Sequence, residues 1–129
     1  MYGFNVTVTG TLDEVREQVT AELQKEGFGV LTEIDVAATL KKKIDVDRNP
    51  YVILGACNPA LANQAINAEP DIGLLLPCNV LVREEEDGSI TVAFMDPVAV
   101  MSLVKKDGVE QLAAEVRGLL EGVRDALKA

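Results

Sequence analysis

The sequence predicts an α+β fold, with a sheet of about five mostly antiparallel strands and helices packed on one face. Residues 2–8 and 89–95 alternate between large apolar side chains and smaller or polar ones, which is the period of a half-buried strand. The Asp87-Gly88 pair joins two strand-like segments as a β-hairpin. Each main helical segment carries a single apolar stripe, which is typical of a helix that covers one face of a sheet.

The 129 residues fit one domain, which is long enough to bury a core without disulfide bonds. With 48% hydrophobic and 26% charged residues, the composition excludes a disordered or collagen-like chain. The chain contains no repeat, low-complexity tract or long polar linker. We therefore expect a single two-layer domain over residues 1–129.

The first half of the chain predicts two strands and two helices. After the strand at 2–8, Thr11 and Glu14 form a capping box that begins a helix, and Gly27 is placed to end it. A strand at 30–34 follows, and then a short amphipathic helix at 35–43 with its lysines in solvent.

The second half begins with Tyr51-Val52-Ile53-Leu54, a continuous apolar run. Such a run is typical of a strand buried on both faces, so we expect it in the middle of the sheet. The elements expected after it are a helix at 59–68, an apolar connection at 72–76, strands at 79–84 and 89–95, a short helix from Asp96 to about Val104, and a helix from Val109 to Leu127.

The charge balance argues against a nucleic-acid partner. The chain has 12 Lys plus Arg and 21 Asp plus Glu, a formal net charge of −9, whereas nucleic-acid affinity comes mainly from basic residues that neutralise phosphates. Aromatic residues are only 4% of the chain, which leaves few platforms for base stacking. We interpret the one basic cluster, Lys41-Lys42-Lys43, as the solvated face of a helix.

The sequence contains no histidine, which removes the usual general base at neutral pH and every imidazole-dependent catalytic triad. Two cysteines without imidazole do not complete a four-ligand zinc site in one chain. Gly27 and Gly29 lack a third glycine and follow a helix, so they form no dinucleotide-binding motif. We therefore predict neither a metal nor a cofactor.

We expect the protein to be cytoplasmic and not to associate with a membrane. Two cysteines in a chain of this length are not a disulfide framework, which favours a reducing compartment. Residues 1–5 lack the positive region of a signal peptide, and no run approaches the roughly 18 apolar residues of a membrane helix.

Helices on one side leave the other side of the sheet to a partner or ligand. The outward side chains of the last predicted strand, Thr91, Ala93 and Met95, are apolar enough to receive a second subunit. We therefore expect a homodimer that associates through the sheet and the C-terminal helix.

Cys57 and Cys78 are the candidate catalytic residues. Cys57 precedes the helix start Asn58-Pro59, and the N–H groups of a helix N-terminus stabilise a thiolate. Cys78 lies 21 residues later, beside Asn79, at the start of another strand, so both thiols are expected at one end of the sheet. They are a redox or nucleophilic pair, contacts for a ligand, or structural cysteines, since free cysteine is among the most buried residue types.

The amides of Asn58 and Asn79 complete the candidate ligand-binding set with Cys57 and Cys78. Uncharged amides suit a neutral polar group in a pocket. For Asn58 the alternative is helix capping, which by itself accounts for an asparagine before Pro59.

The two segments that contain the cysteines read GACNPALA at 55–62 and PDIGLLLPCNV at 70–80. With the Asp87-Gly88 turn and the Asp96-Pro97 step, they resemble the prokaryotic family named domain of unknown function 302. The resemblance extends over nearly the whole chain. It implies a two-layer α+β domain with a curved sheet, similar to the TATA-binding-protein-like arrangement, and a dimer. It implies no reaction.

Two classes of function therefore stay open. The first is a dimeric binding module that holds an unidentified small molecule or a protein partner near the two Cys-Asn steps. The second is a cysteine-dependent redox or transfer enzyme with Cys57 as thiolate and Cys78 as resolving partner. The change Cys57→Ser separates them, because it abolishes thiol chemistry and leaves a binding module competent.

Overall fold

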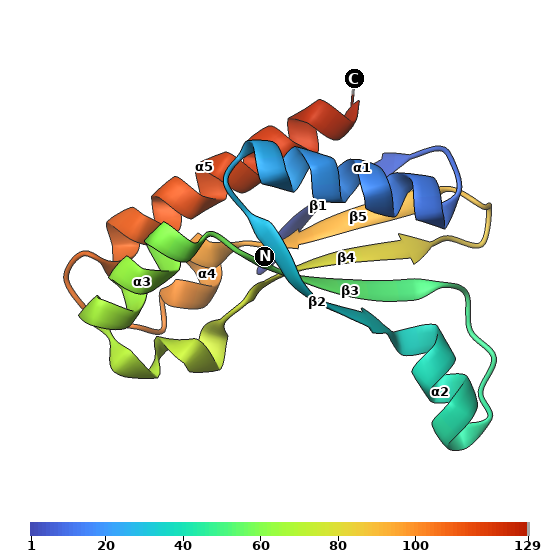
Figure 1. The fold of residues 1–129 in the computed structure, drawn as a ribbon, viewed down its shortest axis with the longest axis horizontal. Coiled ribbons are helices and arrows are strands. Elements are labelled where there is room, and N and C mark those ends of the chain that lie inside the picture. The colour runs from blue at the N-terminus through green and yellow to red at the C-terminus, as the bar shows by residue number, and fades with distance from the viewer. Residues whose placement is uncertain (129) are drawn as a thin grey trace.

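The computed structural model describes residues 1–128 and contains one five-stranded sheet (Figure 1). The strand order is β1-β5-β4-β3-β2, and all four strand pairs are antiparallel. The predicted α+β architecture is confirmed, and the sheet, which was expected to be mostly antiparallel, is antiparallel throughout. The strands are β1 (Gly3–Val8), β2 (Gly29–Asp35), β3 (Tyr51–Cys57), β4 (Cys78–Glu84) and β5 (Ile90–Met95).

The two longest helices, α1 (Leu12–Lys25) and α5 (Val109–Lys128), lie across one face of the sheet, which we call the covered face (Figure 1). At one end of the sheet, α2 (Val36–Ile44) projects beyond β2. At the other end lie three short helices, α3 (Pro59–Ala68), the 3₁₀ helix η1 (Pro70–Leu75) and α4 (Pro97–Met101). None of the helices within residues 1–128 has the length and apolar character needed to cross a membrane.

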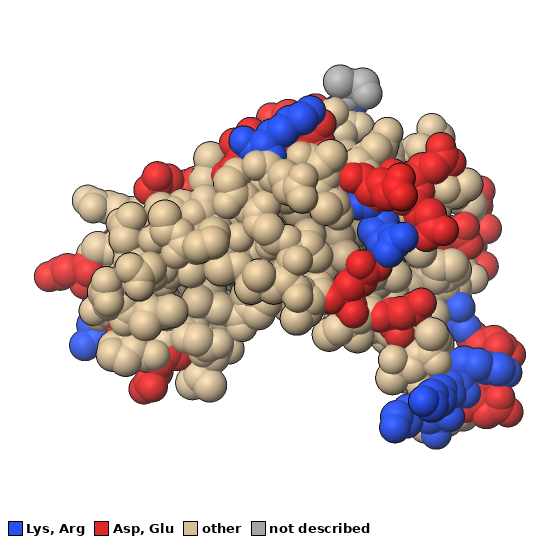
Figure 2. Space-filling model, in the orientation of Figure 1, with Lys and Arg blue, Asp and Glu red and all other residues tan. Residues whose placement is uncertain are grey.

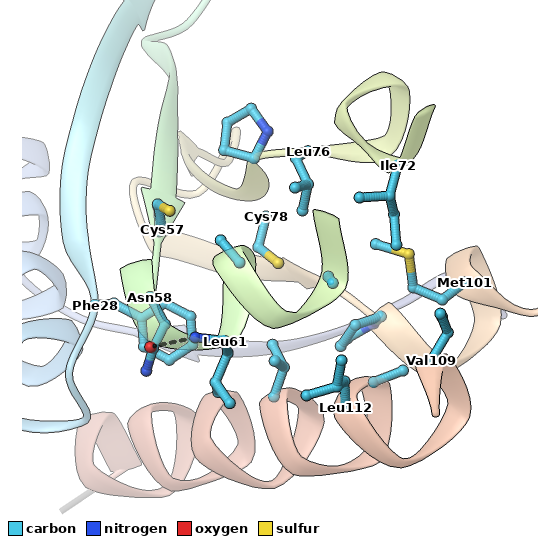
Figure 3. A pocket seen from close by; sticks show the side chains of 17 residues that line it. Phe28, Cys57, Asn58, Leu61, Ile72, Leu76, Cys78, Met101, Val109 and Leu112 are labelled. Atoms are coloured by element: carbon cyan, nitrogen blue, oxygen red, sulfur yellow. Dashed lines mark hydrogen bonds between the residues drawn. The ribbon is translucent and has the colours of Figure 1, made fainter. Parts of the chain in front are cut away.

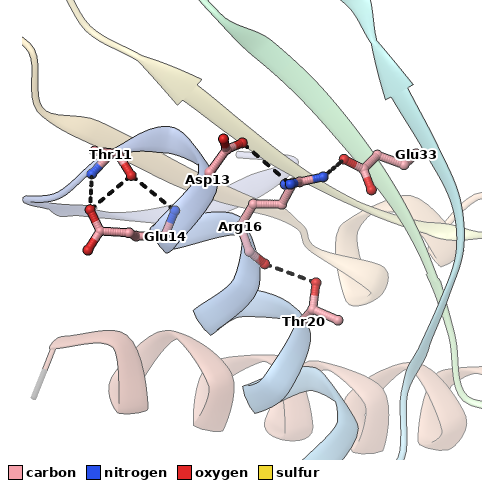
Figure 4. Close-up of polar contacts among 6 residues, drawn as sticks. All are labelled: Thr11, Asp13, Glu14, Arg16, Thr20 and Glu33. Atoms are coloured by element: carbon pink, nitrogen blue, oxygen red, sulfur yellow. Dashed lines mark hydrogen bonds and ion pairs between the residues drawn. The ribbon is translucent and has the colours of Figure 1, made fainter.

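Local chemistry fixes the ends of α1 as the sequence predicts. The Thr11 hydroxyl accepts a hydrogen bond from the Glu14 N–H at 3.2 Å, and a Glu14 carboxylate oxygen accepts one from the Thr11 N–H at 3.3 Å. Gly27 follows the last turn with φ +85°, a left-handed conformation that favours glycine. Arg16 then joins α1 to the edge strand β2 through an ion pair with Glu33 (Figure 4).

The main core lies between the covered face and the two long helices. Phe4 of β1 and Phe94 of β5 stack with their ring centroids 5.4 Å apart, and the Arg124 guanidinium of α5 lies 5.2 Å from the Phe4 centroid. The fully buried side chains of this core come from α1, α5 and every strand except β1 and β2, and include Val15, Val19, Leu23, Leu54, Val80, Val82, Val92 and Leu120.

Three expectations from the sequence are wrong in detail. The central strand is β4, not β3, and Ile53 of β3 is only half-buried because helices cover one face alone. The expected apolar connection at 72–76 lies largely within η1. The short helix that begins after Asp96 ends at Met101, before the expected Val104.

The face opposite the helices, which we call the open face, has an ordered arrangement of side chains. Strand register aligns Asn5, Ala93, Leu81, Ile53 and Ile34 in one row across all five strands. A second row contains Thr7, Thr91, Arg83 and Tyr51. The open face therefore has an apolar central row with polar side chains beside it. Thr91, which the sequence predicted to be available to a second subunit, is only 3% exposed because its neighbours cover it.

Candidate functional site

An apolar pocket lies where β3 ends and β4 begins, enclosed by α3, η1, α4 and α5 (Figure 3). We call it the cysteine pocket because Cys57 and Cys78 both line it. Its volume is about 50 Å³. The other lining residues are Phe28, Ala56, Asn58, Leu61, Ala62, Ala65, Ile72, Leu76, Pro77, Pro97, Met101, Val109, Leu112, Ala113 and Val116.

Helix capping and strand pairing bring Cys57, Asn58 and Cys78 together. The Asn58 side-chain oxygen accepts a hydrogen bond from the Leu61 N–H at 3.2 Å, so Asn58 caps α3 directly after Cys57 (Figure 3). Cys78 opens β4 and pairs in register with Ala56, the residue before Cys57. The two thiols thus belong to neighbouring strands at the same end of the sheet.

The two cysteines differ in environment, although both are free thiols. Cys78 is 7% exposed, and burial, with a smaller contribution from Cys57, raises the pKa of its thiol to about 11. Cys78 is therefore protonated at neutral pH, whereas the reactive form of cysteine is the thiolate. Cys57 is half-buried. No Lys or Arg lines the pocket to stabilise a thiolate.

Asn79 lies on the other side of the sheet. Successive residues of a strand point to opposite faces, so Cys78 points into the protein while Asn79 is exposed on the open face. There it lines a separate hollow of about 400 Å³ with Tyr51, Leu81, Arg83 and other residues. The structure thus brings three of the four candidate residues together and leaves Asn79 outside the cysteine pocket.

Several pocket residues were not singled out from the sequence. Ile72, Met101 and Val109 form a second buried cluster with Ala65 and Ala113, and all five line the pocket. They come from η1, α4, α5 and α3, which are distant in the chain. The apolar stripes of these segments indicate that their side chains are buried, but not that they meet beside the cysteines.

The chemistry available in the cysteine pocket is that of apolar contact. Asn58 is its only polar lining residue apart from the thiols, and the Asn58 oxygen is engaged by the Leu61 N–H. Within residues 1–128, no three His, Cys, Asp or Glu side chains are grouped so that they could hold a metal ion. The pocket therefore suits a small apolar group rather than an ion.

The sequence model of the family described as domain of unknown function DUF302 matches residues 4–127. The fold is also similar to a crystal structure of an uncharacterized conserved DUF302 protein from Bacillus stearothermophilus. That similarity has a TM-score of 0.92 at 28% sequence identity and covers 98% of each chain. No curated protein matches this chain.

Proposed function

The chain belongs to the DUF302 family, whose name assigns no activity, and we propose that it is a small dimeric binding module. In this proposal the cysteine pocket receives the apolar part of a small molecule. The observation that carries the proposal is the lining, which consists of apolar side chains and two thiols around the single amide of Asn58.

The size of the pocket limits what it holds. One water molecule needs about 10–15 Å³ measured in the same way, so about 50 Å³ accommodates a group of a few carbon atoms. A larger ligand would have to extend beyond the pocket. The ligand class that fits is a molecule with a short alkyl or similar apolar end.

The burial of Cys78 favours binding over cysteine chemistry. A resolving cysteine attacks as the thiolate, and the pKa of about 11 keeps Cys78 protonated. The alternative, a redox or transfer enzyme with Cys57 and Cys78, would have to work with one buried, protonated partner. Free thiols also fit the reducing cytosol, which is the compartment we propose.

A titration with 1-butanol, followed by the NMR signals of side-chain methyl groups, tests binding in the cysteine pocket. We expect saturable shifts at Ile72 and Met101, which line the pocket. Ala65→Leu places extra carbon atoms in the pocket and should abolish these shifts, whereas Ala21→Leu on the exposed side of α1 should not.

Two results would contradict this proposal. Shifts confined to exposed side chains would mean that the pocket does not bind. Retained binding in Ala65→Leu would place the site elsewhere. Cys57→Ser separates the two classes of function, because a binding module keeps its saturable shifts after this change and a cysteine-dependent enzyme loses all thiol chemistry.

The proposed dimer rests on a different observation, the apolar row of the open face. Ala93, Leu81, Ile53 and Ile34 are adjacent across four strands, and each remains partly or largely exposed. An apolar centre with polar side chains around it is the arrangement found in subunit interfaces. A two-fold dimer then uses the open face on both copies. It does not use the C-terminal helix as well, as expected from the sequence, because α5 lies across the opposite, covered face.

Sedimentation velocity over a range of protein concentrations tests the dimer. We expect a dimer at micromolar concentration, and we expect Leu81→Asp to give a monomer because it places a charge at the centre of the row. Ala114→Asp, exposed on α5, makes a similar change outside the open face and should leave the dimer intact. A wild-type chain that is monomeric throughout would refute the dimer.

A further inference from the structure

Two segments flank the open face, one at each end. The first, which we call the arm, is residues 36–50 and contains α2; the second, which we call the lobe, is residues 59–76 and contains α3 and η1 (Figure 1). In the space-filling view the protein is hollowed between them, below the sheet (Figure 2). A second copy seated on the open face would lie between the two segments.

Both segments expose large apolar side chains that nothing within residues 1–128 covers. In the arm, Ile44 is 63% exposed and α2 has no fully buried residue. In the lobe, Leu74 is 87% exposed, and Ile66 is also exposed. Isolated exposed apolar residues are ordinary, but Ile44 and Leu74 belong to the two segments between which the protein is hollowed.

The arm and the lobe carry opposite charge. The arm has Lys41, Lys42, Lys43 and Arg48 against Asp45 and Asp47, so its net charge is 4 − 2 = +2, in a chain whose net charge is −9. The lobe has two acidic residues, Glu69 and Asp71, and no Lys or Arg, so its net charge is −2. Figure 2 shows the arm as the most concentrated basic region in that view.

Some charges of the two segments are already paired within the chain: in the lobe, Glu69 lies 4.0 Å from the Lys106 ammonium. Lys41 forms ion pairs with Asp45 and Asp47 of its own segment, at 2.9 Å and 3.1 Å. Over residues 1–128, neither Lys42, Lys43 nor Asp71 forms an ion pair. These side chains are therefore free to contact a second molecule.

Two copies can meet face to face about a two-fold axis in two ways. One arrangement brings arm to arm and lobe to lobe, and so opposes two lysine clusters. The other brings each arm to the lobe of the second copy, and so opposes the unpaired Lys42 and Lys43 to the unpaired Asp71 in both of two equivalent contacts. Like charges in contact are unfavourable and opposite charges steer association, so the charges select the second arrangement.

We propose that the arm of each copy docks on the lobe of the other, with Lys42 and Lys43 facing Asp71 and with Ile44 beside Leu74. This inference rests on the dimer proposed above and specifies its orientation. It also connects the two proposed binding events, because the lobe supplies Leu61, Ala65, Ile72 and Leu76 to the cysteine pocket. A docked arm would cover the outer surface of this part of the lobe.

Charge reversal tests the docking. We expect the double change Lys42→Glu/Lys43→Glu to raise the dimer dissociation constant at least tenfold, which is about 1.4 kcal/mol. Adding Asp71→Lys to the same chain should recover part of the affinity, because it reverses the opposing charge. The measurement is sedimentation velocity at low and at high ionic strength, and the difference between the chains should shrink at high salt.

The matched control is Lys25→Glu/Lys128→Glu, which changes two exposed lysines of α1 and α5 on the covered side. It shifts the net charge by the same −4, from −9 to −13. We expect its dissociation constant to stay within about threefold of the wild type. Equal weakening by both double changes would mean general repulsion and would overturn the docking.

The outcomes separate this inference from the proposal beneath it. A wild-type chain that never dimerises refutes the dimer, and the docking with it. A wild-type dimer that is unaffected by Lys42→Glu/Lys43→Glu retains the dimer and overturns the docking alone. Circular dichroism should show the same helix content in every chain, because all the altered side chains are exposed.

Discussion

The covered and open faces of the sheet are built from alternate residues of the same strands, yet they differ sharply in burial. On β4, Val80 and Val82 are fully buried under the helices, while Leu81 between them is only half-buried. On β3, Leu54 and Ile53 differ in the same way. The cause is that α1 and α5 cover one face, whereas no helix of the described part of the chain, residues 1–128, covers the other.

This difference assigns different tasks to the two faces. Burial of apolar area stabilises the fold by about 25 cal/mol per Å², so the covered face carries most of the stability. The open face contributes less to folding and is available for association. Substitutions on neighbouring residues of one strand, which share their backbone surroundings, test this division directly.

The largest expected effect comes from Leu54→Ala on the covered face. Removing this fully buried side chain leaves a cavity and should destabilise the protein by about 2–5 kcal/mol. Ile53→Ala, one residue earlier and half-buried, should cost the monomer about 1 kcal/mol. Urea unfolding measures both, and only the Ile53→Ala difference should grow with protein concentration if the open face associates.

The opposite ranking would contradict the division of tasks. If Ile53→Ala destabilises the protein as much as Leu54→Ala at the lowest protein concentration, the open face contributes equally to folding. The comparison requires unfolding curves of equal slope, because a changed slope would indicate a change in the surface exposed on unfolding.

The next largest expected effect is the pH dependence of stability that the Cys78 thiol causes. Its thiol pKa is about 11 in the folded protein, against an ordinary value of 9.0. Between these values the unfolded chain loses this proton and the folded protein keeps it, so stability falls as pH rises from about 9 to 11. The loss from this group is about 2–3 kcal/mol, from two pH units at 1.36 kcal/mol each.

Chemical denaturation of the wild type and of Cys78→Ala at pH 8 and pH 11 measures this loss. The stability difference between the two chains should narrow by about 2–3 kcal/mol at the higher pH. Val82→Ala, an equally buried change on β4 without a titrating group, should keep a constant difference from the wild type. If the stability difference between Cys78→Ala and the wild type also stays constant, burial does not raise the pKa of the Cys78 thiol.

Features set by local chemistry could be predicted from the sequence. Thr11 and Glu14, three residues apart, form reciprocal hydrogen bonds, and Asp87-Gly88 forms a tight turn. Neither feature depends on distant parts of the chain. The end of the sheet at which Cys57 and Cys78 meet could also be predicted, because each lies at the terminus of a strand.

The mistaken position of β3 has a physical reason. A continuous apolar run such as Tyr51 to Leu54 indicates that both faces of a strand are apolar, but not what covers each face. Here one face lies under helices and the other belongs to the open face. A strand with an association surface therefore has the same pattern as a strand buried in the middle of a sheet.

The cysteine pocket could be predicted only in part. Periodicity identifies which face of a segment is apolar, but not its partner, so the meeting of Ile72, Met101 and Val109 had no signal in the sequence. The sequence did contain a signal that Asn79 is separated from the pocket. Residues 78 and 79 are consecutive in a strand, and consecutive side chains point to opposite faces.

A substitution of Gly55 should have a smaller effect on stability. At this position the open face has no room for a side chain. A Cβ there would overlap the Thr32 hydroxyl oxygen of β2 and lie 3.0 Å from Cγ of Pro77. Gly55→Ala therefore requires these neighbours to move and should cost about 1–3 kcal/mol. Gly29→Ala, where a Cβ meets nothing within 4 Å, is the control and should be nearly neutral in thermal unfolding.

The smallest effect on folding is expected for Asn79→Ala, beside Cys78 but on the open face. Asn79 is exposed and forms no side-chain hydrogen bond among residues 1–128, so its loss should change the unfolding free energy by less than about 0.5 kcal/mol. Cys78→Ser, which buries a hydroxyl group, should cost about 1–3 kcal/mol. Because Asn79 borders the apolar row, Asn79→Ala should still alter the dimer dissociation constant in sedimentation velocity. If it changes folding as much as Cys78→Ser and leaves association untouched, the two faces do not divide their tasks as proposed.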